Sequence, residues 1–359
     1  MANAPRRFLR TAALAAMLVA VHAVPARAQG RVTFVADALF FGDNTEFRNA
    51  FREGETIFGA AAMLGAEIPL NERVTLVAGG FGLRRFGSAE GFDLARPVLT
   101  LRLTSGRSRF VMGTLETPLA GSPAGPDRTG PHGLLPPLQR ETLAFERPYE
   151  AGLQWKFAGA ALRHDVWINW QRVNTPAHRE RFDAGAAGEA RVTSWLAIPF
   201  QAHIVHEGGQ LFDTDPVADS WAMASGAIVR HAVRGAALTL ETHGLLSRYV
   251  PDREVRTQFI EGSGVFTRVA AERSGWRGHV AAWRGRNFVK VEGDTNYLSL
   301  TRGGDRYRAA RDYSEAGLTR TFRPAPEALV EASARLHRVQ DKYEYSFRVI
   351  AAVHVRRPL

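Results

Sequence analysis

The sequence contains no cysteine in its 359 residues, and beyond the N-terminal region it contains no long hydrophobic run. The absence of cysteine excludes disulfide-stapled scaffolds, cysteine-ligated zinc or iron–sulfur sites and a catalytic thiol. After residue 30 no apolar run approaches the ~18 residues that a helix needs to span a bilayer, so a helical membrane protein is excluded as well. With 23% charged residues and a mean hydropathy of −0.18, the chain has the average composition of a soluble protein.

The first 28 residues have the pattern of a secretory signal peptide. Three arginines precede an apolar stretch over residues 11–24, and residues 26–28 have the A-x-A form of a cleavage site. We expect the mature chain to begin near Gln29, and an uncleaved anchor helix is the alternative. The segment holds four arginines and no acidic residue, so its removal lowers the net charge from +10 to +6. This mild excess contains no block of basic residues, and no nucleic-acid partner is expected.

From residue 31 onward, apolar and polar side chains alternate with a period of two, which is typical of two-faced β-strands. In residues 149–157, for example, apolar side chains occupy the odd positions, whereas Glu150, Gln154 and Lys156 occupy even ones. The alternation restarts sixteen times, and the predicted strands are 31–41, 54–68, 73–86, 92–104, 108–116, 143–157, 161–172, 180–188, 194–207, 220–230, 235–249, 256–270, 275–286, 309–322, 327–339 and 344–357.

The links between these segments alternate between long and short. Every even-numbered link has three or four residues, whereas the odd-numbered links include stretches of 26 and 22 residues. Transmembrane β-barrels have short periplasmic turns and longer extracellular loops, and only alternate residues of their strands face lipid. The sequence therefore predicts an all-β, antiparallel up-and-down transmembrane barrel of about 16 strands, with 14 to 18 possible, as one domain over residues 29–359. A soluble periplasmic β-protein is the alternative, and it leaves the link pattern unexplained.

Aromatic residues support a membrane location for these strands. Tyr149, Trp170 and Tyr345 lie near the expected outer ends, and Trp155 and Trp276 near the inner ends, as interfacial girdles require. Together with the signal peptide and the link pattern, this architecture resembles Gram-negative outer-membrane porin-like barrels. The resemblance implies an outer-membrane location, contact with outer-membrane lipids, assembly by the barrel-assembly machinery and passage of small hydrophilic solutes through a weakly selective channel. It leaves open a homo-oligomer.

The polar strand faces would then line an aqueous lumen. The candidate pore-lining residues are Arg96, Arg102, Glu150, Lys156, Arg163, Asp165, Asn169, Gln201, His203, Glu241, His243, Glu261, Glu331, Arg335, His337 and Arg348. Many of them could instead pair across neighbouring strands. In the porin resemblance the third extracellular link, here 117–142, folds inward and narrows the pore, and a mobile exposed loop is the alternative. Whether the links 117–142 and 287–308 fill the interior distinguishes an open from a blocked lumen.

Two clusters of reactive residues are candidate sites. His203 and His206 cannot share a metal ion, because residues three apart in a strand point to opposite faces. Glu331, Ser333 and His337 share one strand face and contain the residue types of a hydrolase. Some outer-membrane barrels are lipases or deacylases, but their catalytic groups lie on the outer face. We therefore predict no catalytic residue, no metal, no cofactor and no enzymatic activity; the alternative is a blocked barrel that modifies lipid or acts as a structural or binding protein.

Overall fold

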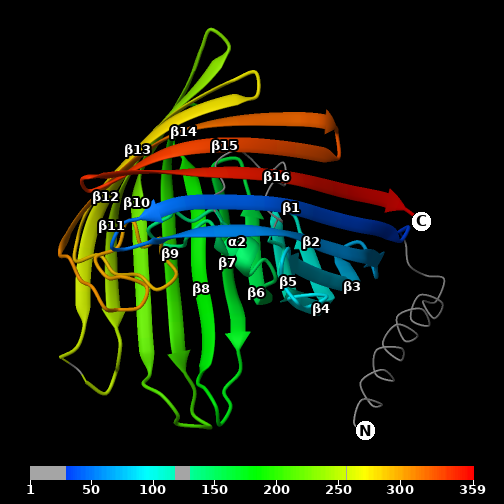
Figure 1. Ribbon diagram of the computed structural model, residues 1–359. Helices are drawn as coiled ribbons and strands as arrows, with labels where there is room; N and C mark the ends of the chain where they lie inside the picture. Colours follow the sequence, from blue (N-terminus) through cyan, green and yellow to red (C-terminus); the bar gives the residue numbers. More distant parts are fainter. Residues whose placement is uncertain (1–29, 118–129, 256) are drawn as a thin grey trace.

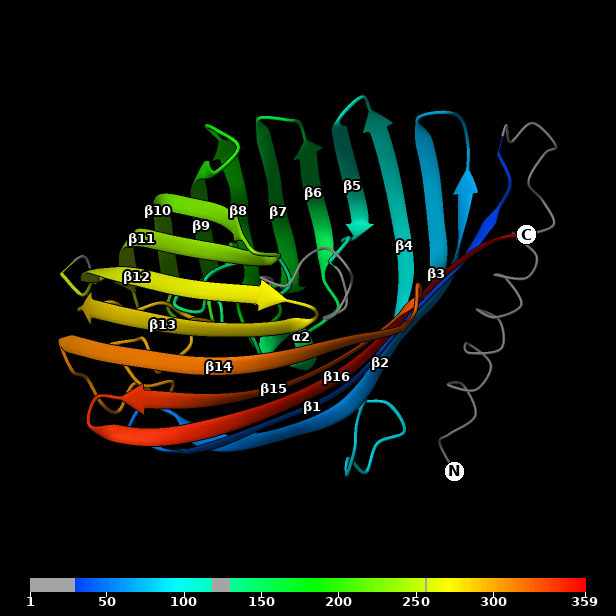
Figure 2. The same cartoon turned by 90° about the horizontal axis from the view of Figure 1, so that it is seen from above.

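The computed structural model describes residues 30–117, 130–255 and 257–359, and these form a closed antiparallel barrel (Figures 1 and 2). Each strand pairs with its neighbours in the sequence, and β1 pairs with β16 to close the ring. The strands are β1 (Thr33–Arg48), β2 (Glu53–Pro69), β3 (Val74–Arg85), β4 (Leu94–Ser105), β5 (Ser108–Thr114), β6 (Ala151–Ala158), β7 (Leu162–Arg172), β8 (Glu180–Arg191), β9 (Leu196–Gly208), β10 (Ala218–Val233), β11 (Ala236–Val250), β12 (Ile260–Arg273), β13 (Trp276–Arg286), β14 (Ala310–Ala325), β15 (Ala328–Val339) and β16 (Lys342–Pro358). The predicted signal peptide, residues 1–28, lies outside the described residues.

The predicted fold class and the predicted number of strands are confirmed. The even-numbered links contain two to four residues, and the odd-numbered ones include the long segments between β5 and β6 and between β13 and β14. A closed barrel leaves no unpaired sheet edge around most of its wall, so the backbone of each strand finds its hydrogen bonds within the protein. In the part of the chain that is described, no helix is long and apolar enough to cross a bilayer.

Two predicted boundaries were wrong. The first strand was expected to end at residue 41, but β1 continues to Arg48, with Asp43 and Thr45 buried on its inner face. Its outer half has a polar inner face and therefore lacks the apolar signal of a core strand. The sixth strand was expected to begin at residue 143, but α2 (Leu143–Glu146) occupies this position and β6 begins at Ala151.

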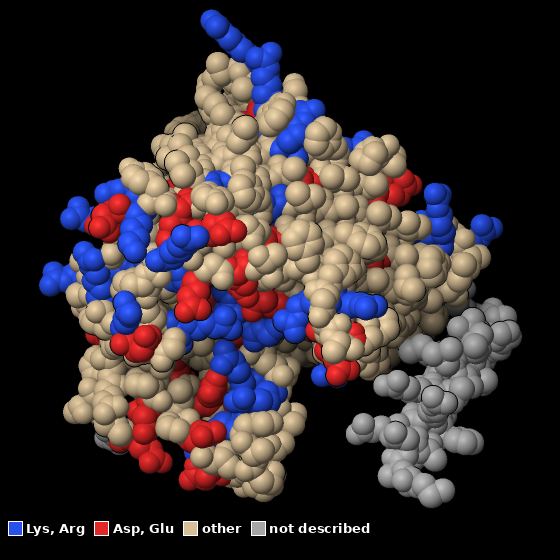
Figure 3. Space-filling view, in the orientation of Figure 1, with Lys and Arg blue, Asp and Glu red and all other residues tan. Residues whose placement is uncertain are grey.

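The two faces of the wall differ in polarity. Leu99, Leu153 and Val280 are among the large apolar side chains that point outward and are exposed. Figure 3 shows that charged side chains gather at its lower left, where the long links lie, and that most of the strand surface above is uncharged. An uncharged outer face and a polar inner face are what a barrel in a bilayer requires.

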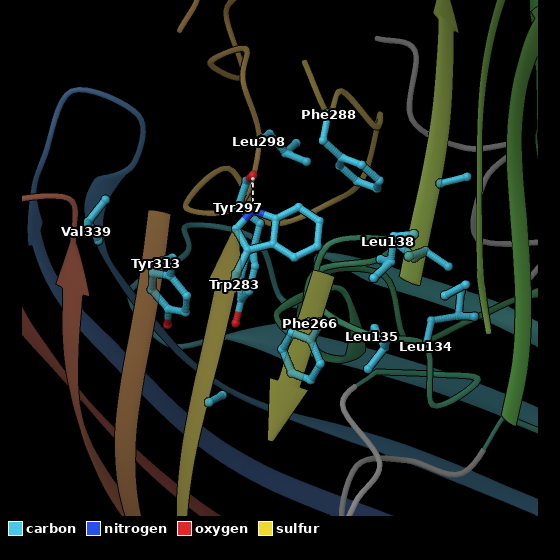
Figure 4. Close-up of a cluster of buried hydrophobic side chains, with 14 of the residues drawn as sticks. Leu134, Leu135, Leu138, Phe266, Trp283, Phe288, Tyr297, Leu298, Tyr313 and Val339 are labelled. Atoms are coloured by element: carbon cyan, nitrogen blue, oxygen red, sulfur yellow. Dashed lines mark hydrogen bonds between the residues drawn. The ribbon is translucent and has the colours of Figure 1, made fainter. Parts of the chain in front are cut away.

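The interior is filled by two of the long links. In the link that precedes β6, Leu134, Leu135 and Leu138 are almost fully buried, and they share a hydrophobic cluster with residues of the link between β13 and β14 (Figure 4). The indole of Trp283 on the wall donates to the carbonyl of Tyr297 at 2.9 Å, which ties this second link to the barrel. The described part of the link 117–142 therefore folds into the barrel, whereas residues 118–129 lie outside the described residues.

Candidate functional site

A serine, a histidine and a glutamate from three consecutive strands lie in a row on the inner wall, and the histidine is hydrogen-bonded to the serine. Ser346 on β16, His337 on β15 and Glu315 on β14 all point inward, because each occupies the inner register of its strand. The Ser346 hydroxyl lies 2.8 Å from Nε2 of His337, and Nδ1 of His337 lies 3.5 Å from Oε2 of Glu315. This order of groups is that of a hydrolytic triad.

Tyr313 fixes which nitrogen of His337 can act as a base. The single hydroxyl hydrogen of Tyr313 is donated to Oε2 of Glu315 at 2.5 Å. Since the same oxygen lies 2.7 Å from Nδ1 of His337, Nδ1 carries the ring hydrogen and donates it to Tyr313. Nε2 of the neutral ring is then the acceptor that faces Ser346. His279 lies 2.9 Å from the other oxygen of Glu315 and holds the carboxylate in place.

The row lines a small cavity of about 30 Å³, which is also lined by three arginines, Arg52, Arg335 and Arg348. Arg335 and Arg348 lie 2.9 and 2.7 Å from Oε2 of Glu141, a residue of the inward-folded link. Burial alone would raise the pKa of Glu141, but the two arginines lower it to about 2. The guanidinium groups of Arg335 and Arg348 therefore line the same cavity as Ser346 and are held by Glu141.

The segment that carries α2 separates this small cavity from a larger one. Glu141 and Thr142 line the small cavity, whereas Gln139 and Leu143 line a cavity of about 810 Å³ on the side of the long links. A further cavity of about 550 Å³ lies on the side of the short turns. Among the described residues the two large cavities share no lining residue, because the inward-folded links lie between them.

Comparison with known proteins identifies the family of this chain. A model of the lipid A 3'-O-deacylase-type family matches residues 24–356, nearly the whole sequence. The chain belongs to this family. No curated protein matches it in sequence.

Solved structures with a similar fold are outer-membrane barrels. The loop L8 deletion mutant of OmpT from Vibrio cholerae is 11% identical, with a TM-score of 0.56 over 90% of this chain and 99% of that chain. OccK8 (OprE) of Pseudomonas aeruginosa is 12% identical, with a TM-score of 0.54 over 90% and 98% of the two chains. OccAB1 of Acinetobacter baumannii is 10% identical, with a TM-score of 0.51 over 92% and 98%. At these identities the likeness shows the fold alone.

Membership of the lipid A 3'-O-deacylase-type family corrects two sequence-based expectations. The prediction that the chain is not an enzyme is wrong, because the family is defined by an enzymatic activity. The resemblance to porin-like barrels is right for an outer-membrane barrel, but the matching family is not a porin family. The outer-membrane location and contact with membrane lipids are confirmed.

Fifteen of the sixteen candidate pore-lining residues of this family member do face the interior. The large outer cavity is lined by Arg96, Glu150 and Asn169, the cavity near the short turns by Arg102 and Lys156, and the small cavity by Arg335, His337 and Arg348. The others bond to the wall or to the inward-folded link: Arg163 to Glu189, Asp165 to His132, Gln201 to Leu135, His203 to Asp183, Glu241 to His243 and Glu331 to Thr321. Most of them pair with neighbours instead of lining an open channel.

Glu261 is the exception, because its side chain points outward. On β12 the even positions, such as Phe266, face inward, so Glu261 at an odd position faces the opposite side. It lies 3.3 Å from Arg248, another outward residue, near the end of the strands that bears the long links. At this end of β12 a charged side chain faces outward, because the strand has left the apolar part of the membrane.

The candidate Glu331, Ser333 and His337 set is not the arrangement that forms. Both ring nitrogens of His337 are occupied by residues of neighbouring strands, Ser346 and Tyr313. Sequence reasoning missed Glu315 and Ser346 as partners of His337, because strand register alone brings these three residues together. His203 and His206 do point to opposite faces: His203 bonds to buried Asp183, and His206 to Asp219.

Proposed function

We propose that this chain is an outer-membrane hydrolase that removes an ester-linked acyl chain from lipid A, the reaction that the family description names. The observation that carries the proposal is the family match over residues 24–356. Two features of the structure support it: the lumen is filled by inward-folded links, and the inner wall presents the Ser346, His337 and Glu315 row.

The chemistry would proceed through an acyl-enzyme. Ser346 Oγ attacks the ester carbonyl carbon while Nε2 of His337 accepts its proton. The bond between the carbonyl carbon and the sugar oxygen breaks, and the sugar alkoxide takes the proton from His337. A water molecule then attacks the acyl-serine while the same nitrogen accepts its proton. The bond between the carbonyl carbon and Ser346 Oγ breaks, Oγ takes the proton back from His337, and the fatty acid is released. Glu315 stabilises the imidazolium that forms twice in this sequence.

The arginines of the small cavity would stabilise the negative charge of the transition state. Negative charge develops on the carbonyl oxygen during each attack, and positive groups fixed beside it lower the barrier. Arg335 and Arg348 line the cavity that Ser346 faces, and Glu141 and Asp43 hold their guanidinium groups in position.

The small cavity has room for about one water molecule, so the ester must displace part of the protein to reach Ser346. The segment 139–146 is the barrier, since Glu141 and Thr142 line one side of it and Gln139 and Leu143 the other. We infer that this segment shifts when the substrate occupies the 810 Å³ cavity. The segment belongs to the link between β5 and β6 and is not itself paired in the sheet, which permits such a movement.

The filled lumen disfavours the passive channel that the porin resemblance implies. A pore requires a continuous aqueous path, and the two large cavities are separated by the inward-folded links. We further infer that residues 1–28 direct export and are removed, and that residues 29–359 form one domain. Assembly by the barrel-assembly machinery and a homo-oligomeric state stay predictions. N-terminal sequencing of protein purified from outer membranes tests the cleavage site.

The hydrolase proposal is tested with the purified full chain in detergent and lipid A as substrate. Mass spectrometry should detect a free fatty acid and a lipid A product that has lost one ester-linked acyl chain, and fragmentation should place the loss at the 3' position. The S346A and H337N variants should release no fatty acid above background, whereas S333A, another inward serine, should retain activity. Intact lipid A after prolonged incubation with a folded barrel would refute the proposal.

A further inference from the structure

In the part of the chain that is described, the barrel wall is incomplete between β4 and β7. The ladder between β4 and β5 ends at Thr100 and Gly113, although β4 starts six residues earlier, at Leu94. The next strand, β6, begins only at Ala151 and pairs with β7 from Asn169. Figure 2 shows β5 ending while β4 continues beside it. Among the described residues, 94–99 therefore have β3 on one side and no strand on the other.

Side chains take the place of a strand along this free edge. Pro97 has no N–H to leave unpaired, and its carbonyl accepts a hydrogen bond from the Tyr149 hydroxyl at 2.9 Å. The N–H of Leu99 donates to the Thr114 hydroxyl at 3.3 Å. At ~3.3 Å per residue the unpaired edge is roughly 20 Å long, enough for a lipid acyl chain to pass. The Pro97 carbonyl and the Leu99 N–H are thus satisfied without a neighbouring strand, as contact with lipid requires.

We call the gap between residues 94–99 of β4 and the start of β6 and end of β7 the notch. It lies at the level of the outer leaflet. It occupies the half of β4 nearer the long links, which are extracellular in barrels of this type. Apolar side chains point outward around it: Leu99 is 59% exposed, and Trp170, at the matching end of β7, is 45% exposed. The outward surface beside the notch is therefore a lipid-contacting one.

The 810 Å³ cavity lies against this notch. Residues on both sides of the notch line it: Leu94 and Arg96 on β4, and Asn169 and Trp170 on β7. Leu94 lies on the inner face of the free edge. The missing strand is therefore the part of the wall that would separate this cavity from the outside of the barrel.

The lining suits an anionic amphiphile. Leu94, Phe86 and Leu143 offer apolar contacts, and Arg96 and Arg302 offer positive charge. Among the described residues neither arginine has a carboxylate within 4 Å. Three of the four carboxylates of the same cavity are engaged: Asp93 with Arg85, Glu146 with Arg140 and Glu150 with His132. Glu55 is the fourth, so two arginines face one carboxylate without an ion pair. The charge left for a ligand is therefore positive.

We propose that the notch between β4 and β7 is a lateral opening through which an anionic lipid of the outer leaflet inserts its acyl chains into the 810 Å³ cavity. This inference rests on the proposed function, because it names the route by which the substrate approaches α2 and Ser346. The head group stays near Arg96 at the edge, and the acyl chains lie against the apolar lining.

Photo-crosslinking tests the opening independently of hydrolysis. The chain has no native cysteine, so a single introduced cysteine carries a benzophenone label without a competing site. In the S346A background, L94C places the label on the inner face of the free edge and L99C on the lipid-facing side. S333C labels the inner wall outside the cavity and is the matched control. Each protein is folded into vesicles that contain either lipid A or phosphatidylglycerol, and heat-modifiable gel migration verifies the barrel.

We expect L94C to crosslink lipid at a yield close to that of L99C, and S333C to stay at background. Adding R96E to L94C should lower the yield about fivefold, as for the loss of one charge contact, without changing L99C. A yield in the lipid A vesicles alone identifies the glycolipid as the ligand, and equal yields in both vesicles identify anionic lipid in general. If L94C crosslinks no more lipid than S333C while L99C does crosslink it, the lateral opening is overturned, and the hydrolase assay remains a separate test. If L94C crosslinks lipid but the wild type hydrolyses none, the opening is supported and the enzymatic activity is refuted.

Discussion

The hydroxyl oxygen of Ser346 lies 2.8 Å from Nε2 of His337, a residue of the neighbouring strand. In the ladder Ser346 stands opposite Arg335, two positions from His337, so the two side chains meet diagonally on one face of the sheet. A shift of the β15–β16 register by one residue would turn Ser346 toward lipid. The contact therefore depends on the closed barrel, which fixes the register.

Replacing Ser346 by alanine should reduce fatty acid release from lipid A by about 10³-fold or more, the usual cost of losing a triad member. The E315Q variant should also be impaired, since a neutral amide stabilises the imidazolium less well. Release is measured by mass spectrometry under single-turnover conditions. S333A is the control for loss of an inward serine, and a fully active S346A enzyme would show that another group attacks the ester.

Folding stability should depend on pH through His132 of the inward-folded link. Its ring nitrogens lie 2.8 Å from Glu150 and 3.0 Å from Asp165, and its ring stacks on Trp167 with centroids 3.6 Å apart. Burial alone would lower the pKa of His132, but the two carboxylates raise it from 6.5 to about 9. A raised pKa stabilises the folded state fully below pH 6.5, and this contribution is lost as the pH rises toward 9.

The H132N variant should accordingly be less stable than the wild type by on the order of 3 kcal/mol at pH 6, with a difference that shrinks up to pH 9. Urea unfolding in lipid vesicles, followed by tryptophan fluorescence at three pH values, measures this. H231N, at an exposed position of β10, is the matched control. A difference of the same size at pH 6 and pH 9 would contradict the assignment of a charged His132.

The two inward-folded links should block the lumen only while Glu292 holds them together. One oxygen of this carboxylate lies 2.5 Å from Arg147 and 2.9 Å from Arg181, and its backbone carbonyl accepts a hydrogen bond from the N–H of Arg140 at 2.7 Å. These contacts join the link between β13 and β14 to the segment that carries α2 and to β8. The wild-type protein should show no discrete openings in a planar bilayer. The E292A variant removes the carboxylate that Arg147 and Arg181 share, and it should show transient openings.

The outward residue Glu261 provides the control for that experiment, because E261A removes a carboxylate without touching the interior. Stable openings of the wild-type protein would instead establish a conducting pore, and its reversal potential in a salt gradient would report which charge sign dominates the path.

Arg311 should be one of the most sensitive positions for stability. Its side chain is fully buried on β14 and donates to the carbonyls of Leu298 at 2.6 Å and Asn296 at 3.0 Å. Its guanidinium carbon lies 3.3 Å from the ring centroid of Phe51, in the link between β1 and β2. Because R311M leaves two buried carbonyls without a donor, it should cost on the order of 2–4 kcal/mol of unfolding free energy.

Urea unfolding in vesicles compares R311M with R338M, which removes an exposed arginine from β15. Only R311M should shift the midpoint, and it should also increase protease cleavage within residues 287–309. Equal midpoints for both variants would mean that the buried guanidinium contributes little.

The barrel itself was predictable because its signal is local. The alternation in residues 235–249 corresponds to β11 (Ala236–Val250), since successive side chains of a strand must point to opposite faces whatever the partner strands are. Where one face of a strand contacts lipid and the other the interior, apolar and polar residues alternate along the sequence and reveal the strand. The prediction failed at α2, because residues 143–150 pack on the inner wall and not within it, and at the outer half of β1, where Asp43 and Thr45 interrupt the apolar pattern.

The sequence by itself determined the strand count, the inward direction of most charged residues and the placement of long and short links, because each follows from period-two geometry and turn chemistry. The tertiary structure decided which inward residues meet. Glu315, His337 and Ser346 come together through the registers of three strands, and the two links that close the lumen come together through buried contacts such as that between Trp283 and Tyr297. Register and loop packing are collective properties of the closed barrel, so no single stretch of sequence specifies them.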